Sequence, residues 1–257
     1  MLEGYHKIKK FLYLILFIIL AITFFTKSNY KNAEIINPSV LNEPIQEETA
    51  SRDIIQFTKN DYEYSLTPLY NYEINALVVR KMDYTKFSIY KMDSVFPRDL
   101  CVVWGSNVSN KIYQDKSLKF SQDMRFCFAR WEGNLDFNTS EVSNNHLVIQ
   151  DKEIEKKVKK ISIGDQVKIR GKLVDVEAKN VGNPGEYDPE YFTLKSSITR
   201  EDTTAGACEI IYIESVEILQ KGNPVSYNLF KISFYGLVVL LILNIILIFI
   251  KLRPKQF

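Results

Sequence analysis

The most reactive side chains in this sequence belong to three cysteines and to one histidine far from the termini. Cys101, Cys127 and Cys208 each lie in a short apolar segment typical of a β-strand, and His146 lies in SNNHLVIQ. Beside a polar or thiol partner, a histidine acts as a general base, so His146 is a weak catalytic candidate. The competing interpretation, which we favour, is a turn histidine whose ring is held by a hydrogen-bonding neighbour such as Asn144.

The same cysteines predict one disulfide if the domain is exported to an oxidising compartment. Three pairings are open, and we expect one pair and one buried thiol. The sequence contains no C-x-x-C or H-x-x-x-H spacing, so no metal site is predicted. P-loop and dinucleotide-binding motifs are also absent from it, and no cofactor is predicted.

A dense polar segment, SSITREDTTAGACE, occupies residues 196–209. As a ligand loop it would bind an anion through Arg200. As a wide hairpin it would be held by hydrogen bonds between its own backbone and the side chains of Asp202 and Thr203. The hairpin interpretation is favoured.

Alternating apolar and polar residues predict a domain made mainly of strands that position these side chains. Strand-like segments occupy residues 61–69, 72–82, 100–104, 124–131, 166–176 and 208–219. One helix is predicted over 151–160, where acids come first and lysines last. Gly171, inside a strong strand, predicts a bulge or a sharp bend. Short strands around a bent strand indicate a small OB-like barrel.

Two uncharged apolar blocks, residues 11–25 and 232–250, indicate membrane helices. The first follows lysines, as in a secretory signal, but no small-residue cleavage site follows it, so we expect an uncleaved anchor. The second is long enough to cross the hydrocarbon core, and its one polar residue, Asn244, has two interpretations: a bond to a partner helix, or simple exposure to lipid.

The formal net charge of +2 divides unevenly along the chain. Residues 1–10 carry +2 and residues 251–257 carry +3, which leaves −3 for everything between the two blocks. Because basic flanks stay in the cytoplasm, both termini are predicted to be cytoplasmic and the middle periplasmic. The acidic middle lacks the electrostatic footprint of a nucleic-acid-binding protein, so that class of partner is excluded.

Five strings together are similar to a family of bacterial membrane-anchored proteins with two terminal spans, one extramembrane domain and no established activity. The strings are YSLTPLYNYEINALVV, LCVVWGSNV, SNNHL, GDQVKIRGKLV and TREDTTAGACEIIYIE, and they cover about residues 60–220. The resemblance implies the architecture alone. It leaves the motif residues as binding candidates without roles: Trp104, Asn145, His146, Arg200, Asp202 and Cys208.

The predicted fold class is α+β, mainly β, with one short helix and a small OB-like barrel between two transmembrane helices. The expected boundaries are a basic tail (1–10), an anchor (8–26), a flexible linker (27–54), a β-rich domain (55–222, with its OB-like part at about 160–220), a second span (231–250) and a basic tail (251–257).

Three functions are compatible with this organisation, and fold alone does not choose among them. The favoured hypothesis is a non-enzymatic binding or assembly module of the bacterial inner membrane, whose partners are the lipid bilayer and other envelope membrane proteins. The alternatives are a membrane-bound hydrolase or transferase using His146, and a solute sensor that signals through the spans. Convergence of Asn145, His146, Arg200 and Cys208 in one cleft would favour the enzyme, and opposite faces would exclude it.

Overall fold

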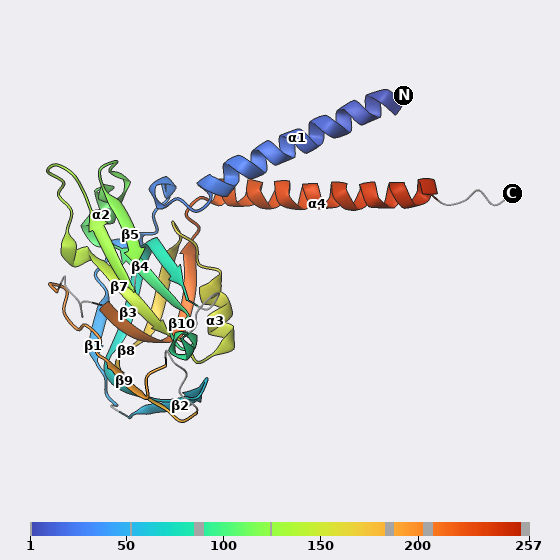
Figure 1. Cartoon of the computed structure of the whole chain (residues 1–257). Coiled ribbons are helices and arrows are strands. Elements are labelled where there is room, and N and C mark those ends of the chain that lie inside the picture. The colour runs from blue at the N-terminus through green and yellow to red at the C-terminus, as the bar shows by residue number, and fades with distance from the viewer. Residues whose placement is uncertain are drawn as a thin grey trace. The chain divides into compact units, whose positions relative to one another are not determined.

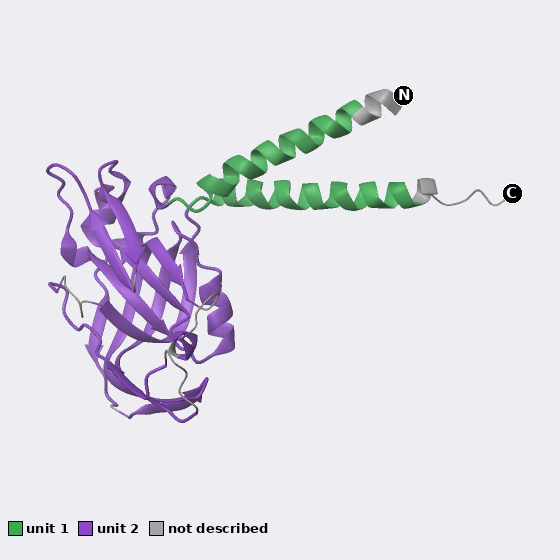
Figure 2. Cartoon of the chain, in the orientation of Figure 1, with its two compact units in different colours: residues 1–29, 223–257 green, residues 30–222 purple. Residues whose placement is uncertain are grey.

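The computed structural model describes residues 2–51, 53–84, 90–123, 125–182, 188–202 and 208–252. The chain forms two compact units (Figure 2). One contains Tyr30–Gly222, and the other joins the terminal segments Met1–Asn29 and Asn223–Phe257. The structure is a mixed α/β, sheet-rich protein with two apolar terminal helices, and this part of the expectation from sequence is confirmed.

The described elements follow one another as shown in Figure 1. The helices are α1 (Leu2–Thr26), α2 (Gly105–Ser109), α3 (Lys152–Lys159) and α4 (Pro224–Leu252). The strands are β1 (Ile45–Glu48), β2 (Ile55–Lys59), β3 (Tyr62–Asp83), β4 (Arg98–Val103), β5 (Lys119–Asp123), β6 (Phe126–Arg130), β7 (Val142–Val148), β8 (Gln166–Asn180), β9 (Tyr191–Leu194) and β10 (Cys208–Gln220).

Five of these strands pair into a closed ring in the order β3, β4, β7, β10, β8 and back to β3. All neighbours are antiparallel except β7 and β10, which are parallel. We call this set the ring. The first strand of the ring begins at Tyr62 and the last ends at Gln220. The ring therefore includes about 100 more residues than the OB-like part expected from sequence at 160–220.

Apolar side chains fill the inside of the ring because alternate residues of every strand face inward. Leu100, Leu147, Ile169 and Ile211, from four different strands, belong to one buried cluster. Val158 of α3 closes this cluster, and its helix begins at Asp151, whose carboxylate accepts hydrogen bonds from the next turn. The predicted helix at 151–160 is therefore present, and α2 is an additional short helix that the sequence pattern did not predict.

The segments 61–69 and 72–82, expected as two strands, form the single strand β3. A register shift between Pro68 and Tyr70 absorbs the interruption, which is how a bulge lets a strand continue through a proline. Gly171 has the role of a close-contact residue, because a Cβ there would lie 2.0 Å from the Tyr212 carbonyl oxygen.

From Tyr30 onward, the segment expected to be a flexible linker, 27–54, packs against the ring. Tyr30, Ala33 and Val40 are buried, and β1 pairs with β3. Two short 3-10 turns, Tyr30–Asn32 and Pro38–Leu41, carry the buried Tyr30 and Val40. The stretch from Tyr30 onward therefore belongs to the same compact unit as the ring, and residues 27–29 belong to the unit of the terminal helices.

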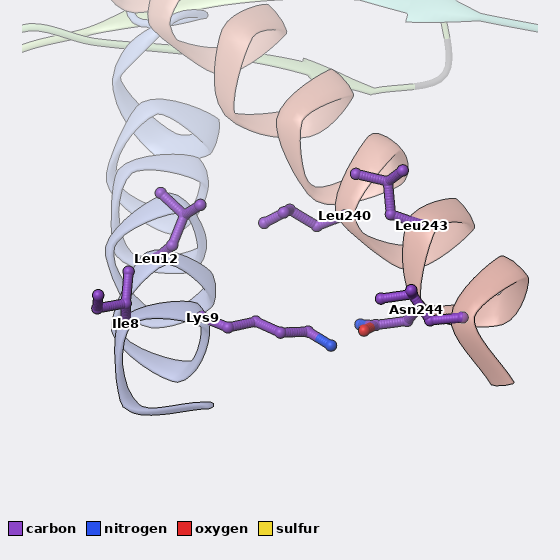
Figure 3. Close-up of a pocket in the computed structure, with 7 residues that line it drawn as sticks. Ile8, Lys9, Leu12, Leu240, Leu243 and Asn244 are labelled. Atoms are coloured by element: carbon purple, nitrogen blue, oxygen red, sulfur yellow. The ribbon is translucent and has the colours of Figure 1, made fainter. Parts of the chain in front are cut away.

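Two helices are long and apolar enough to cross a membrane, over Lys7–Thr26 and Pro224–Phe249. Within their unit they bond to each other: Thr26 donates to Ser226 at 2.9 Å, and Asn244 donates to the Tyr13 hydroxyl. A pocket of about 130 Å³ lies between α1 and α4, and Lys9 extends across it toward Asn244 (Figure 3). Asn244 thus bonds to the other helix of its own chain, one of the two interpretations left open by the sequence.

Candidate functional site

The predicted site residues divide between the inside and the outside of the ring. Neighbours in the sheet share a face, and Asn145 pairs with Glu209 while Asn144 pairs with Cys208. Asn145 alternates with the inward-facing Leu147, so Asn145 and Glu209 face inward. His146 and Cys208 therefore face outward. The four-residue catalytic cleft considered from sequence does not form, because Asn145 and Arg200 lie on the inner side and His146 and Cys208 on the outer.

A polar cluster, which we call the mouth, lies at the end of the ring away from α3. This end contains the end of β4 and the start of β7, since Val103 pairs with Val142. The mouth consists of Glu43, Gln46, Tyr72, Trp104, Ser143, Asn145, Arg200 and Glu209.

Arg200 is the central cation of the mouth. Its Nη1 lies 2.7 Å from Glu209 Oε1, and its Nη2 donates to Gln46 Oε1 at 3.2 Å. The guanidinium lies 5.2 Å from the Tyr72 ring centroid and 5.8 Å from that of Trp104, within the range of cation–π attraction. Because a buried carboxylate already pairs with Arg200, this residue does not present a free charge to an anion.

Glu209 is only 3% exposed, and burial raises its carboxyl pKa to about 7 even though Arg200 acts in the opposite direction. Its Oε2 has no aligned hydrogen-bond partner among the described residues, and neither does Asn145 Oδ1. The Ser143 hydroxyl is near enough to favour the charged carboxylate, but its contact falls short of an aligned bond to Oε2. Among the described residues, these two side-chain oxygens on adjacent strands are thus buried close together with no aligned hydrogen-bond partner.

The outward-facing residues form a second cluster, which we call the thiol centre: Asp99, His146 and Cys208. They lie on the adjacent strands β4, β7 and β10, where Asp99 pairs with His146 across the sheet. The Nδ1 of His146 lies 2.9 Å from Asp99 Oδ1; its N–H is not aligned with that oxygen, so we describe the contact as an ion pair. Cys208 is the diagonal neighbour of His146 on β10, because Asn144 pairs with Cys208 and His146 with Ile210.

The surroundings of His146 favour its protonated form. Burial alone would disfavour the imidazolium, but the hydrogen bonding and charge of Asp99, together with Cys208, outweigh burial and raise the pKa of His146 to about 9. Asp99 is fully buried, and the His146 side chain is 13% exposed. The centre therefore combines a buried carboxyl group, a strongly basic imidazole and a partly accessible thiol.

Arg125 and Asn144 border the thiol centre. Arg125 contacts Asp99 at 3.3 Å, pairs with Asp93, and lies 3.8 Å over the Tyr84 ring. Asn144 donates through Nδ2 to the Arg125 carbonyl at 2.6 Å and to Cys208 Sγ at 3.4 Å. Arg125 adopts a left-handed backbone with φ of 67°, an uncommon conformation for a residue with a side chain.

A disulfide between Cys101 and Cys127 ties β4 to the β5–β6 hairpin that carries Arg125. Cys208 is the free cysteine. Of the three pairings left open by the sequence, the structure therefore contains the Cys101–Cys127 pair. Asp202 bonds Ser197 at 2.6 Å and so holds its own segment, while residues 203–207 lie outside the described part of the chain.

Sequence reasoning named Trp104 and Arg200 as candidates, and the structure places them near each other in the mouth, but it did not name Glu209 or Asp99. Glu209 has a recognisable signal, since strand alternation in CEIIYIESVEIL puts this charged residue in register with the inward Ile211 and Ile213. The sequence signal for Asp99 is weaker: this residue lies two positions before Cys101 in the same strand, so the two side chains point to the same face of the sheet. His146 is held by Asp99 and Cys208, a contact between strands that no local pattern encodes.

Within the described residues, no group of three or more His, Cys, Asp or Glu side chains is arranged to hold a metal ion. Comparison of the chain with protein-family models gives no match, and neither the curated proteins nor the solved structures compared with it match.

Proposed function

We propose that this protein is a membrane-anchored binding or assembly module whose extracytoplasmic ring binds its partner at the mouth. The ring, with five strands closed on each other and α3 packed on its core, fits a small OB-like barrel. Barrels of this type carry ligands on the ring surface and in the loops between strands, which is where the mouth residues lie.

The pair of buried acceptors, Asn145 Oδ1 and Glu209 Oε2, is the observation that supports binding. Buried polar atoms in folded proteins almost always have partners, and an acceptor left alone costs about 1–3 kcal/mol. These two lie on directly paired residues of β7 and β10 and face the same interior. A partner that supplies N–H or O–H donors would relieve both costs at once.

The chemistry around the acceptors favours a polypeptide segment. Trp104 and Tyr72 are buried, so the accessible part of the mouth is Gln46 on the edge strand β1, with Glu43 and Arg200 beside it. Backbone N–H groups are the donors most readily delivered in a row to such an edge. We expect this segment to belong to another envelope membrane protein, because the chain on both sides of the ring unit continues into apolar helices.

Photo-crosslinking in intact membranes tests this proposal. A benzoylphenylalanine at Gln46 faces the mouth, and one at Glu217, exposed on the outer side of β10, is the matched control. The expected result is a discrete adduct with a membrane protein from position 46 and none from position 217.

We further propose a two-pass topology with both termini in the cytoplasm and the ring in the periplasm of the inner membrane. The basic segments at residues 1–10 and 251–257 support this orientation. A reporter that is active only in the cytoplasm is expected to be active when it is fused after Phe257. Activity of a periplasm-specific reporter at that position would contradict the proposed topology.

A further inference from the structure

The geometry points to a second site on the outer face of the ring: the thiol centre, in which Cys208 is a nucleophile for acyl transfer, His146 its acid–base partner and Asp99 the residue that positions His146. The division of the sequence candidates between two faces excludes an enzyme built from all four of them; the thiol centre is a smaller site, formed by His146 and Cys208 together with Asp99, which the sequence did not indicate. This inference does not depend on the proposed binding at the mouth, because the two clusters face opposite sides of the sheet.

Three contacts carry the inference. His146 lies between Asp99 and Cys208 on one face of the sheet: its Nδ1 is 2.9 Å from the fully buried Asp99 carboxyl group, and the thiol is its diagonal neighbour on β10. The three side chains therefore lie in the order nucleophile, base and orienting carboxyl group on three neighbouring strands. A thiol is activated by this arrangement. Asn144 Nδ2, 3.4 Å from Sγ, is a donor beside the position where an oxyanion would form.

The cysteine inventory favours acyl transfer over disulfide exchange. The chain has three cysteines, two of which are joined to each other, so Cys208 has no second thiol to resolve a mixed disulfide. Cys101 and Cys208 both lie opposite Asn144 on its two neighbouring strands, about 9–10 Å apart by strand spacing, which is too far for exchange within the ring. Acyl transfer requires only one thiol and one acid–base group.

The balanced reaction uses an ester or thioester, R–CO–X. As the Cys208 sulfur attacks the carbonyl carbon, the thiol proton passes to His146 and a C–S bond forms. The C–X bond then breaks, and His146 delivers that proton to X, which leaves as HX. Water then attacks the thioester while His146 takes its proton. The C–S bond breaks, the acid R–COOH leaves, and the thiol is restored.

Alkylation by iodoacetamide tests the activation of the thiol. In the full chain in detergent or nanodiscs, Cys208 is the one cysteine outside the disulfide, so the label reports on it alone. We expect His146→Gln to slow alkylation at pH 7 about tenfold, Asp99→Asn to slow it less, and Glu217→Gln, an exposed change on the same strand, to leave it unchanged. Equal rates in wild type and His146→Gln would overturn the inference.

Comparison of the folded and unfolded wild type keeps the test independent of variants that fold poorly. The groups that face His146 are Asp99, Cys208, Arg125, Asp93 and Tyr84. With these in place, Cys208 of the folded protein should react with iodoacetamide at pH 7 faster than Cys208 of the same chain unfolded in urea, where the thiol has lost these neighbours. A slower reaction in the folded protein would contradict the inference.

Acylation is measured with p-nitrophenyl acetate followed by acid quenching and mass spectrometry. An acetyl group on Cys208, formed about 100-fold more slowly in His146→Gln, is the expected result. Fast alkylation without an acetyl adduct would overturn acyl transfer. Tryptophan fluorescence of each variant confirms that the ring is folded.

Discussion

Replacing Cys101 and Cys127 together with alanine is expected to lower the free energy of unfolding of the ring by about 3.5 kcal/mol. The disulfide spans 26 residues of sequence, and breaking it returns that loop's conformational freedom to the unfolded chain. Both tryptophans, Trp104 and Trp131, lie in the ring unit, so their fluorescence during urea unfolding reports on the ring and not on the membrane helices.

A reductant separates the cross-link from the packing of the cysteines. Dithiothreitol should shift the unfolding midpoint of the wild type and leave that of the double variant unchanged. Cys101 is fully buried, so any difference between reduced wild type and variant measures the lost packing of its sulfur. An unfolding curve that is the same with and without the disulfide would contradict the tie between β4 and the hairpin.

The second large effect is a fall in stability as the pH rises from about 4.5 to 7. The pKa of Glu209 is raised to about 7 in the folded protein, so the folded state keeps a proton that the unfolded chain has released. Stability is therefore complete below the unfolded pKa and declines as pH rises through the folded one, by up to about 3 kcal/mol. Urea midpoints at half-unit pH steps measure this decline.

Glu209→Gln should remove the decline between pH 4.5 and 7, because glutamine does not titrate. His146 adds a separate window: its pKa is raised to about 9, so its contribution is complete below pH 6.5 and is lost as the pH rises toward 9. Glu209→Gln should leave that upper window intact. A wild-type midpoint that is constant from pH 4.5 to 7 would show that Glu209 is not the buried acid described.

Much of the architecture follows from patterns that are local in sequence. The apolar blocks, the alternation in β8 and β10, and the capped helix after Asp151 each reflect a period or a cap that one segment contains. The apolar residues of 27–54 were present in the sequence as well, but their burial depends on a surface supplied by the ring. Closure between β3 and β8 joins residues about 100 positions apart, which no local pattern specifies.

The thiol centre likewise depends on contacts between residues far apart in the sequence. His146 was visible as a candidate because of its chemistry, yet its partner Asp99 is 47 positions away and Cys208 is 62 positions away. Their contact exists because β4, β7 and β10 are neighbours in one register. A shift of one residue in any of these strands would turn the side chain to the other face and break the centre.

The most direct test of binding at the mouth is the adduct from the photo-crosslinker at Gln46, measured with and without Glu209→Gln. The glutamine amide places a donor where the partner would supply its own, so the adduct yield should fall about tenfold, the equivalent of one hydrogen bond of roughly 1.4 kcal/mol. Glu217→Gln, the same change on the outer side of β10, should leave the yield unchanged. Equal adduct yields in all three proteins, or the same adduct from position 217, would contradict binding at the mouth.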